Sequence, residues 1–357
     1  AQHTRFQHSL GAFYLTSEAI LSLTLKGVFI FESEAEAVQA AILMHDIGHG
    51  PFSHVLENTL IHGISHEDIS LMMMSQIDHD LGGQLALAIS IFKDEYPKRF
   101  LHQLISSQLD MDRLDYLRRD SFFTGVTEGN IGSARIIKML NVVDDNLVVD
   151  YKGIYSIENY LTSRRLMYWQ VYLHKTTVAC EKQLISLLSR AKYLARQGEQ
   201  LFAPPSLRYF LYNEVDREHF MANGDALHYY ELLDDNDIWS SMKVWMTHSD
   251  PILSLLARDL IERRIFKVEV RNEPVEEAEV SEIQHTIATR MGTTYEEAAY
   301  LVNVSAVQKD MYDIHDDHIS ILYKDGSIKD ITEASEILNI SLLSKKIRKY
   351  YLCYQRF

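Results

Sequence analysis

The spacing of apolar side chains predicts helices over most of the N-terminal half of the chain. In residues 33–45, SEAEAVQAAILMH, apolar positions recur at helical intervals, and Ser33 and Glu36 have the spacing of a capping box. The stretch GHGPF that follows should end this helix, because glycine and proline both disfavour its continuation. HEDISLMMMSQI and FLHQLISSQLDMDRLDYLRRD repeat the helical pattern, and a long helix with one break is expected over residues 156–196.

Strand patterns occur in two places. Residues 140–151, LNVVDDNLVVDY, contain two β-branched runs around a polar turn and predict a hairpin. From residue 266 onward, IFKVEVRN, DHISILYKDGSIKDI and KKIRKYYLCYQRF alternate as strands do, and Asp325-Gly326 is a strong hairpin signal. The expected fold is therefore mainly α, a helical bundle with a small β-hairpin and a C-terminal α+β subdomain. The expected domains are a helical domain over 1–185, a helical extension over 186–265 and the subdomain over 266–357.

Composition narrows the class of protein. The 357 residues, 46% hydrophobic and 24% charged, fit a soluble globular protein with a sizeable core. A net charge of −15 argues against broad binding to a nucleic-acid backbone, but it leaves room for a local basic pocket that binds a phosphorylated small molecule. The two cysteines, Cys180 and Cys353, offer neither a disulfide framework nor metal-ligand spacing. This cysteine usage predicts a reducing, cytoplasmic setting. No apolar run reaches the roughly 18 residues of a membrane span, so we expect no membrane partner.

Residues 43–54, LMHDIGHGPFSH, concentrate ionisable side chains where the helix should end. A single histidine at such a place is most often a cap or a satisfied polar contact, but three histidines and Asp46 so close together weaken that interpretation. His45-Asp46-x-x-His49 also imitates the H-E-x-x-H motif of zinc proteases. Aspartate is shorter than the usual glutamate base, and Gly-His-Gly-Pro breaks the helix at the second ligand, so a protease is disfavoured.

A third interpretation treats His45 and Asp46 as adjacent metal ligands at a helix terminus, with partners elsewhere in the chain. Neighbouring helical residues point about 100° apart, so both reach one ion only near the helix end. His8 in RFQHSLG and Asp112 in DMDRLDY would complete a set of two imidazoles and two carboxylates. The residues alone do not separate Asp112 from the aspartates on either side of it. Such a nitrogen and oxygen set suits a divalent transition metal, Fe, Mn, Co, Ni or Zn.

The strings HTRFQHSLG, HDIGHGPFSH, SHEDIS and DMDRLDYLRRDSFFTG resemble the deoxynucleoside triphosphate triphosphohydrolase branch of the HD-domain metal-dependent phosphohydrolases, which includes the human SAM-and-HD-domain enzyme. The resemblance covers about residues 1–185. Because the chain starts at Ala1, inside the first motif, we expect residues that precede it to be missing. The resemblance implies an HD-domain helical bundle that holds one divalent transition metal. The implied metal ligands are His8, His45, Asp46 and Asp112.

The resemblance also implies roles for other polar residues of the motif and beyond it. His49 and His54 are expected around the scissile phosphate, with His54 near the attacking water or the α-phosphate. His66 should begin a helix with Ser65 as its N-cap. We favour His66 as the general acid that protonates the leaving group, oriented by Glu57. The alternative for Glu57 is a surface charge without a catalytic role.

Two helical faces are expected to hold the substrate. Asp112, Tyr116 and Asp120 recur every four residues, which places a metal ligand, an aromatic ring and an acceptor for a sugar hydroxyl in a row. Three residues of RRLMYWQVYLHKT, from Arg164 on, have the same spacing. Tyrosine rows are more often core, but this segment resembles the one that closes the family's nucleotide pocket. The expected triphosphate contacts are Arg5, Arg113, Arg164 and Lys175, and the expected tyrosine and sugar contacts are Tyr116, Asp120, Tyr168 and Tyr172.

Taken with the resemblance, these features predict hydrolysis of a deoxynucleoside triphosphate to the deoxynucleoside and inorganic triphosphate. The alternatives are another HD-domain reaction, such as that of a 5′-nucleotidase or a cyclic-nucleotide phosphodiesterase, and a nucleotide-binding regulator without turnover. Mg²⁺ on the substrate triphosphate is a further expected cofactor. Members of the family often form homo-oligomers, and some are activated by nucleotides, so a dimer or tetramer with a nucleotide activator is the expected assembly.

Overall fold

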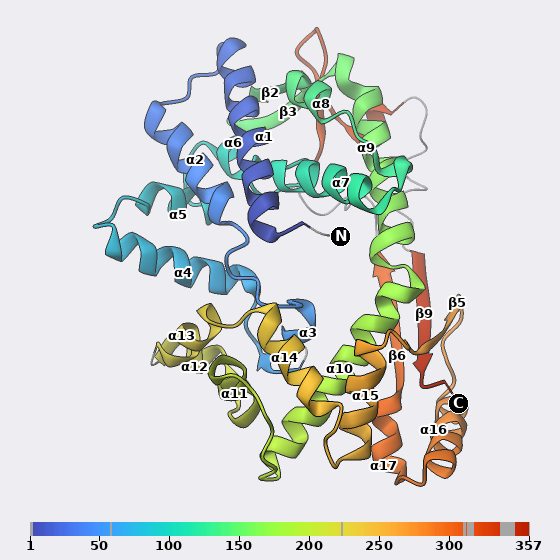
Figure 1. Ribbon diagram of the computed structural model, residues 1–357. Helices are drawn as coiled ribbons and strands as arrows, with labels where there is room; N and C mark the ends of the chain where they lie inside the picture. Colours follow the sequence, from blue (N-terminus) through green and yellow to red (C-terminus); the bar gives the residue numbers. More distant parts are fainter. Residues whose placement is uncertain are drawn as a thin grey trace. The chain divides into compact units, whose positions relative to one another are not determined.

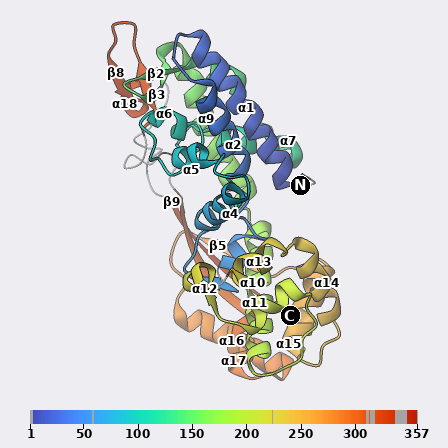
Figure 2. The same ribbon diagram turned by 90° about the vertical axis from the view of Figure 1, so that its left-hand side faces the viewer.

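The computed structural model describes residues 3–57, 59–222, 224–309, 312, 318–335 and 347–356. The chain forms two compact units, each drawn from separate parts of the sequence. The first unit comprises residues 1–48, 70–172 and 309–347, and the second comprises 49–69, 173–308 and 348–357. Both units are mainly helical, as predicted, and Figures 1 and 2 show their elements in two views. Among the helices of the described ranges, none combines the length and the hydropathy that crossing a membrane requires.

The first unit consists of helices with one small sheet. Its helical elements are α1 (Arg5–Leu25), α2 (Glu32–Met44), the larger part of α4 (His66–Asp80), α5 (Ala86–Phe92), α6 (Arg99–Gln103), α7 (Met111–Thr124), η1 (Thr127–Gly129), α8 (Ser133–Met139), η2 (Tyr151–Gly153), α9 (Ile154–Met167), η3 (Tyr168–Tyr172) and α18 (Ile331–Ala334). Its strands are β2 (Leu140–Val143), β3 (Asn146–Asp150), β7 (Ser320–Leu322) and β8 (Ile328–Asp330), in the sheet order β2-β3-β7-β8.

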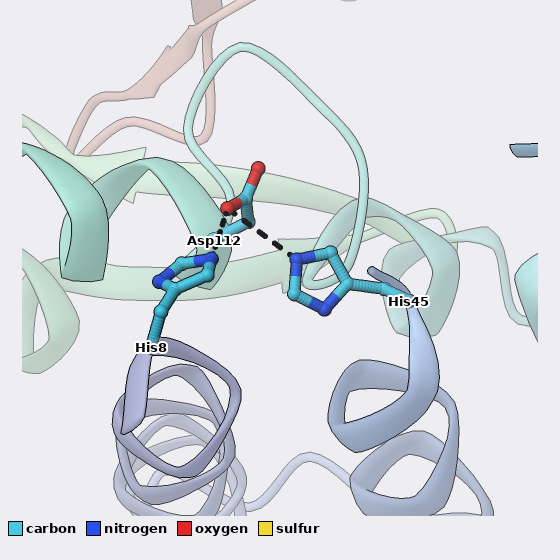
Figure 3. A group of neighbouring side chains, drawn as sticks. All are labelled: His8, His45 and Asp112. Atoms are coloured by element: carbon cyan, nitrogen blue, oxygen red, sulfur yellow. Dashed lines mark ion pairs between the residues drawn. The ribbon is translucent and has the colours of Figure 1, made fainter. Parts of the chain in front are cut away.

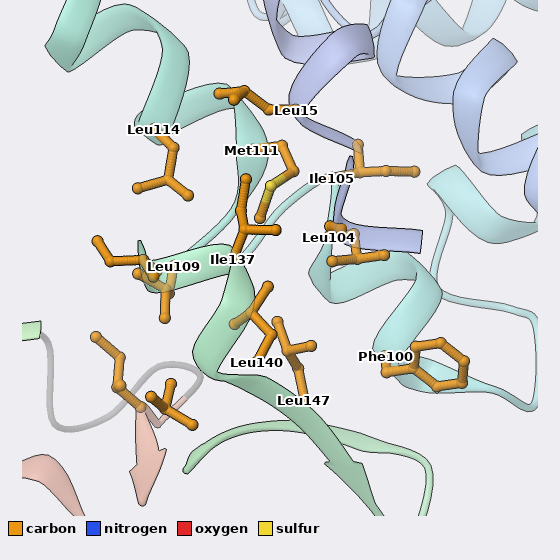
Figure 4. Packing of buried hydrophobic residues seen from close by; sticks show 14 of the residues in the cluster. Leu15, Phe100, Leu104, Ile105, Leu109, Met111, Leu114, Ile137, Leu140 and Leu147 are labelled. Carbon is orange, nitrogen blue, oxygen red and sulfur yellow. The ribbon is translucent and has the colours of Figure 1, made fainter. Parts of the chain in front are cut away.

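The core of this unit fixes α1, α2 and α7 against one another. Along α1, Ala12, Leu15 and Ala19 lie at helical intervals and are buried, and they belong to the same cluster as Met111 and Leu114 of α7. Figure 4 shows part of this cluster around the start of α7 and the end of α8. Each fully buried leucine or methionine contributes about 1.5–3 kcal/mol. The three helices that carry the expected metal ligands therefore share one well-packed core.

The start of α2 differs from the predicted capping box. The helix begins at Glu32, after Phe31, so Ser33 lies inside it. The carboxylate that accepts a hydrogen bond from the backbone N–H of Phe31, at 2.8 Å, belongs to Glu34 and not to Glu36. Glu34 is buried and is also bonded to side chains of the α5–α6 connection, which explains why the helix starts where this carboxylate is satisfied.

The predicted hairpin and the predicted break in the long helix are both confirmed. β2 and β3 pair in antiparallel fashion, with Asp144 and Asp145 in the turn at positive φ of 48° and 57°. The long helix divides into α9 and α10 (Lys175–Arg196). Between them lies η3, a turn of π-helix over Tyr168–Tyr172. The segment FLHQLISSQLDMDRLDYLRRD forms two helices, α6 and α7, and not one.

The second unit surrounds the long helix α10, which contacts α11 and α15. Its other helical elements are α3 (His54–Glu57), α11 (Pro205–Tyr212), α12 (Arg217–Ala222), α13 (Asp225–Glu231), α14 (Asp235–Trp245), α15 (Pro251–Ile261), α16 (Glu277–Met291), α17 (Tyr295–Ala298) and η4 (Ala299–Leu301). Its strands are β1 (Ile61–His62), β4 (Val215–Asp216), β5 (Lys267–Arg271), β6 (Val302–Lys309) and β9 (Ile347–Tyr354). β1 pairs with β4 in parallel, and the other three form a sheet in the order β5-β9-β6.

The C-terminal strands form as predicted but not in one subdomain. β5 and β9 pair in the second unit, and Gly326, at φ 86°, turns the hairpin between β7 and β8. β7, however, pairs in parallel with β3 of the first unit. This pairing covers the edge of β3 opposite β2, an edge that would otherwise expose unpaired backbone groups. The three consecutive segments expected from the sequence are therefore not the two units into which the chain folds.

Candidate active site

Three of the expected metal ligands meet inside the first unit. His8 lies on α1, His45 directly follows the last residue of α2, and Asp112 lies in the first turn of α7. Figure 3 shows both imidazole rings pointing toward the Asp112 carboxylate. Asp112 Oδ1 lies 2.9 Å from Nε2 of His8 and 3.4 Å from Nε2 of His45. The three side chains thus offer two imidazole nitrogens and one carboxylate oxygen to a single point.

The His45 ring is oriented by the end of its own helix. Its Nδ1 lies 2.6 Å from the backbone carbonyl of Ile42. A carbonyl oxygen can only accept, so Nδ1 must carry the proton of this hydrogen bond. His45 Nε2 is buried and has no hydrogen-bond partner among the described residues. A buried nitrogen without a partner is costly unless it has a ligand, and a metal ion would provide that partner.

The His8 ring is held in the same way by a residue outside the predicted set. Its Nδ1 lies 2.7 Å from Oδ2 of Asp115, which also accepts hydrogen bonds from Arg119 Nε at 2.8 Å and Nη2 at 3.0 Å on its two oxygens. Burial alone would raise the pKa of Asp115, but the hydrogen bonds from His8 and Arg119 outweigh it and lower the pKa. The ionised carboxylate therefore keeps a proton on Nδ1 and directs Nε2 toward Asp112.

The ionisation of the cluster is set by its own members. Burial alone would lower the pKa of His8, but hydrogen bonds to Asp112 and Asp115 outweigh it and raise the pKa to about 10. For Asp112 burial alone would raise the pKa, but the adjacent imidazoles of His45 and His8 outweigh it and lower the pKa well below its usual value. Without a cation the histidines therefore hold protons against the carboxylate, and a bound metal would replace the protons on Nε2.

Asp46 lies at the edge of this cluster. Its Oδ1 is 3.4 Å from His45 Nε2 and its Oδ2 is 3.8 Å from His8 Nε2. Arg5 contacts the same carboxylate, with Nη1 2.8 Å from Oδ2. Ligands about 2.1 Å from a metal at near-right angles are about 3 Å apart, so these spacings fit a divalent cation with small adjustments. Arg5, expected to contact phosphate, pairs here with Asp46.

The expected sugar-binding side chains continue from the cluster along α7. The Tyr116 ring is 6.4 Å from the His8 ring, and the Tyr172 ring is 6.1 Å from Tyr116. The Tyr172 hydroxyl donates to Asp120 Oδ2 at 2.7 Å. Tyr168 packs against Tyr172, with ring centroids 5.3 Å apart. The face of α7 predicted from its four-residue spacing therefore exists, and the η3 tyrosines cover it.

The two partly buried arginines of this region differ in their partners. Arg113 pairs with Asp110, the N-cap of α7, and donates to the backbone carbonyl of Ser107. Arg164 lies near Tyr160 and Tyr116, yet its Nε and Nη1 are buried without a hydrogen-bond partner in the described parts of the chain. Two buried guanidinium N–H groups without acceptors are a ready-made site for phosphate oxygens.

The second unit holds the other expected catalytic residues in a cluster centred on Glu57. His66 Nδ1 lies 3.2 Å from Glu57 Oε1, as predicted for the orienting carboxylate, and His54 Nδ1 lies 3.5 Å from Oε2. His54 is largely solvent-exposed, with 72% of its side chain accessible. Ser65 caps α4, accepting a hydrogen bond from the backbone N–H of Asp68 at 3.1 Å, which confirms the predicted helix start at His66.

His49 joins this cluster through its ring and through Ser53. The rings of His49 and His66 are stacked 3.8 Å apart at 16°, and His49 Nδ1 is 2.5 Å from Ser53 Oγ, which in turn donates to Glu57 at 3.3 Å. His49, Glu57 and His66 offer ligand atoms within 4.8 Å of one another, so this group could also hold a cation. Lys175, the first residue of α10, belongs to the same unit and is exposed.

Two supporting residues were not predicted from the sequence. Asp115 orients His8, and Ser53 links His49 to Glu57. A signal for Asp115 was present, because it follows Asp112 by three residues and so lies on the same side of α7. For Ser53, its position four residues before Glu57 was the available signal.

Comparisons with known proteins agree with this arrangement. Residues 5–120 match the HD domain model and residues 131–196 match the HD associated region model. The uncharacterized protein YwfO of Bacillus subtilis is 30% identical over 369 residues, which cover all of this chain and 82% of YwfO. A crystal structure of a phosphohydrolase from Bacteroides thetaiotaomicron superposes with a TM-score of 0.97 at 66% identity, covering 100% of this chain and 88% of that one.

A more distant relative carries a named activity. The deoxynucleoside triphosphate triphosphohydrolase SAMHD1 homolog of Dictyostelium discoideum is 30% identical over 223 residues. The match covers 57% of this chain and 43% of that protein, so the two share less than half of the relative's length.

Proposed function

The chain belongs to the HD-domain family of phosphohydrolases, and from this premise we propose that it hydrolyses deoxynucleoside triphosphates to deoxynucleosides and inorganic triphosphate. The similarity to the Dictyostelium triphosphohydrolase supports this choice of substrate class. His8, His45 and Asp112 support the reaction type, because two imidazoles and a carboxylate suit a divalent transition metal. The second nitrogen of each imidazole is already held by a hydrogen bond, which orients the ring for metal binding.

The observation that carries the proposal is that two buried guanidinium nitrogens of Arg164 have no hydrogen-bond partner among the described residues. Its guanidinium is buried beside the tyrosines of the first unit, and two of its N–H groups have no acceptor within the described ranges. A triphosphate supplies pairs of oxygen acceptors that the planar guanidinium can bind in bidentate fashion. Arg113 is already paired with Asp110. We therefore assign the main triphosphate contact to Arg164.

The remaining roles follow from the chemistry of the reaction. His8, His45, Asp46 and Asp112 would hold one divalent metal, which supplies Lewis acidity and makes water a better nucleophile at neutral pH. Water attacks the α-phosphorus and the bond to the 5′ oxygen breaks, so a proton must reach that oxygen. We assign this proton to His66, whose ring Glu57 holds through Nδ1, and we assign the sugar contact to Tyr116, Tyr172 and Asp120.

Product identity tests the proposal. Purified protein is incubated with each of the four dNTPs in Mn²⁺ and in Mg²⁺, and the products are separated by ion-exchange chromatography. We expect free deoxynucleoside and intact inorganic triphosphate in equal amounts. Release of orthophosphate from nucleoside monophosphates, with no action on triphosphates, would instead indicate a nucleotidase, and tight dNTP binding without turnover in either metal would indicate a regulator.

Substitution of Arg164 tests the assigned contact. Arg164→Lys keeps the charge but loses the planar pair of donors, so we expect KM for the dNTP to rise about tenfold or more with a smaller change in kcat. Arg118→Lys, at an exposed position on α7, is the matched control and should leave both constants unchanged. Equal constants for the Arg164→Lys variant and the unmodified protein would show that the triphosphate binds elsewhere.

A further inference from the structure

His3, in the motif HTRFQHSLG, has no role in the metal cluster or in the proton transfer. It precedes Thr4, the N-cap of α1, and its ring stacks on Phe123 of α7 with centroids 4.8 Å apart at 28°. Its Nε2 lies 3.3 Å from Oδ1 of Asp120, and both side chains are largely buried, with 16% and 19% of their surface accessible. His3 thus joins the start of α1 to the far end of the proposed sugar site.

Asp120 is held at both of its carboxylate oxygens. Tyr172 donates its hydroxyl to Oδ2 at 2.7 Å, while His3 Nε2 approaches Oδ1. Each oxygen of an ionised carboxylate has two acceptor positions, so one further donor can still bind at either oxygen. Two anchors from different segments fix the direction in which the remaining acceptor positions point.

The protonation of His3 follows from its neighbours. Of its two ring nitrogens, Nε2 is the one that faces the Asp120 carboxylate. Burial, the largest influence, lowers the pKa of His3 and favours the neutral ring. Its Nδ1 is buried and has no hydrogen-bond partner among the residues that the structure describes. A neutral ring with its N–H on Nε2 therefore faces the Asp120 carboxylate, which lies 3.3 Å away.

We propose that His3 is a positioning residue for the substrate sugar: together with the Tyr172 hydroxyl it fixes the Asp120 carboxylate so that this carboxylate accepts a hydrogen bond from the 3′-hydroxyl of the deoxyribose. This inference rests on the proposed function of the same site. His3 does not touch the substrate, and its effect passes through Asp120. Its contribution therefore depends on the 3′-hydroxyl and disappears with a 2′,3′-dideoxynucleotide.

The test compares two substrates in two variants. His3→Leu fills a similar volume without a donor, and His3→Gln places an amide N–H near the position of Nε2. With the dNTP that the unmodified protein hydrolyses fastest, His3→Leu lowers kcat/KM about tenfold, mainly through KM, and His3→Gln recovers most of that loss. With the matching 2′,3′-dideoxynucleoside triphosphate, His3→Leu changes kcat/KM by less than about twofold. His79→Leu, at a fully exposed histidine of α4, is the control and changes neither value.

A double-mutant cycle separates positioning from a general structural effect. In an Asp120→Asn background His3→Leu should cause no further loss, because its effect already runs through that carboxylate. Equal losses with both substrates, or an additional loss in the Asp120→Asn background, would overturn the inference. If His3→Leu does not fold, as judged by its thermal unfolding, His3→Asn replaces it, because the shorter amide cannot reach Asp120.

The outcomes also separate this inference from the proposed function. If the unmodified protein hydrolyses no dNTP, the proposed function is overturned, and the inference that rests on it falls as well. If it hydrolyses dNTPs and the ratio of kcat/KM between the two sugars is the same in His3→Leu, only the role of His3 is overturned.

Discussion

At the metal cluster both imidazoles are held through Nδ1 by groups that accept a hydrogen bond. The backbone carbonyl of Ile42 holds His45, and the carboxylate of Asp115 holds His8. Each ring therefore presents Nε2 to Asp112 in one fixed orientation. Such outer partners matter because they set both the tautomer and the basicity of a metal-binding histidine.

Loss of the Asp115 charge should weaken metal binding without unfolding the protein. Asp115→Asn keeps the shape of the side chain but no longer holds the proton on His8 Nδ1 as a carboxylate does. We expect the affinity for Mn²⁺ to fall about 10- to 100-fold, measured by competition with a chromophoric chelator. Asp80→Asn, at an exposed position of α4, is the control. Unchanged affinity in Asp115→Asn would mean that His8 does not depend on this carboxylate for its orientation.

At the scale of single residues the sequence predicted which expected ligands lie close together, but not the residues that hold them. His8, His45, Asp46 and Asp112 stand at the positions that the resemblance implied, and they lie together in the first unit. The pairing of Arg5 with Asp46 was not predicted, because a pattern of residue types does not say which of several nearby charges meet.

Helices α1 and α7 approach each other closely at Gly11. A Cβ at this position would overlap the Asp115 carboxylate and the Arg119 guanidinium. In an exposed helix Gly→Ala stabilises by about 1 kcal/mol, but here the added methyl group would push α1 from α7. We expect Gly11→Ala to destabilise the protein by about 1–3 kcal/mol, as overpacking does, measured by urea unfolding. Glu18→Ala, on the exposed side of the same helix, should change stability far less, and a stabilised Gly11→Ala variant would contradict the close contact.

The start of α2 depends on one buried carboxylate. Glu34 accepts hydrogen bonds from Lys98 Nζ at 2.7 Å, Tyr96 OH at 2.6 Å and the backbone N–H of Phe31 at 2.8 Å. Burial would raise the pKa of Glu34, but these bonds outweigh it and lower the pKa below the usual 4.5. A carboxylate with a lowered folded pKa stabilises the protein above its unfolded pKa, and this stability is lost as the pH falls through the folded value.

Glu34→Gln should therefore be destabilising near neutral pH and nearly neutral in acid. The amide nitrogen cannot accept from the donors that face it, so we expect a loss of about 1–3 kcal/mol at pH 7. As the pH falls through the lowered folded pKa, the wild-type carboxylate becomes protonated and the difference should shrink, as followed by urea unfolding across the acid pH range. Glu36→Gln, two residues further along α2 at an exposed position outside this network, is the control, and an equal loss at both pH values would exclude an ionised Glu34 as the cause.

The sequence predicted the regular helices and strands better than the irregular turns that join them. The Asp144-Asp145 hairpin and the break between α9 and α10 were predicted, because turn residues and a change of periodicity mark them. The π-helical turn at η3 was not predicted, although it places Tyr168 and Tyr172 beside α7. A single wider turn changes the periodicity too briefly for apolar spacing to reveal it.

Over the whole molecule, the motif HDIGHGPFSH divides between the two units. Its first residues, through Gly48, belong to the first unit with His45 and Asp46, and the remainder belongs to the second with His49 and His54. From the sequence pattern the motif is interpreted as one local feature, because the pattern contains no information on where long-range packing separates neighbouring residues. The same limit explains why β7 could be predicted as a strand but not as a partner of β3.

Because all four expected metal ligands lie in the first unit, metal binding should stabilise that unit specifically. At a free metal concentration of 100 times Kd, binding adds about 2.7 kcal/mol. For a unit of this size that corresponds to a rise in Tm of about 5–10 °C. We expect this rise on adding Mn²⁺ to chelator-treated protein, measured by calorimetry, and its loss in Asp112→Asn. His66→Ala is the informative control, because His49, Glu57 and His66 also offer ligand atoms near one another. A full shift in His66→Ala assigns the stabilising cation to the first unit, whereas a reduced shift there and an unchanged one in Asp112→Asn would place the cation on the Glu57 cluster.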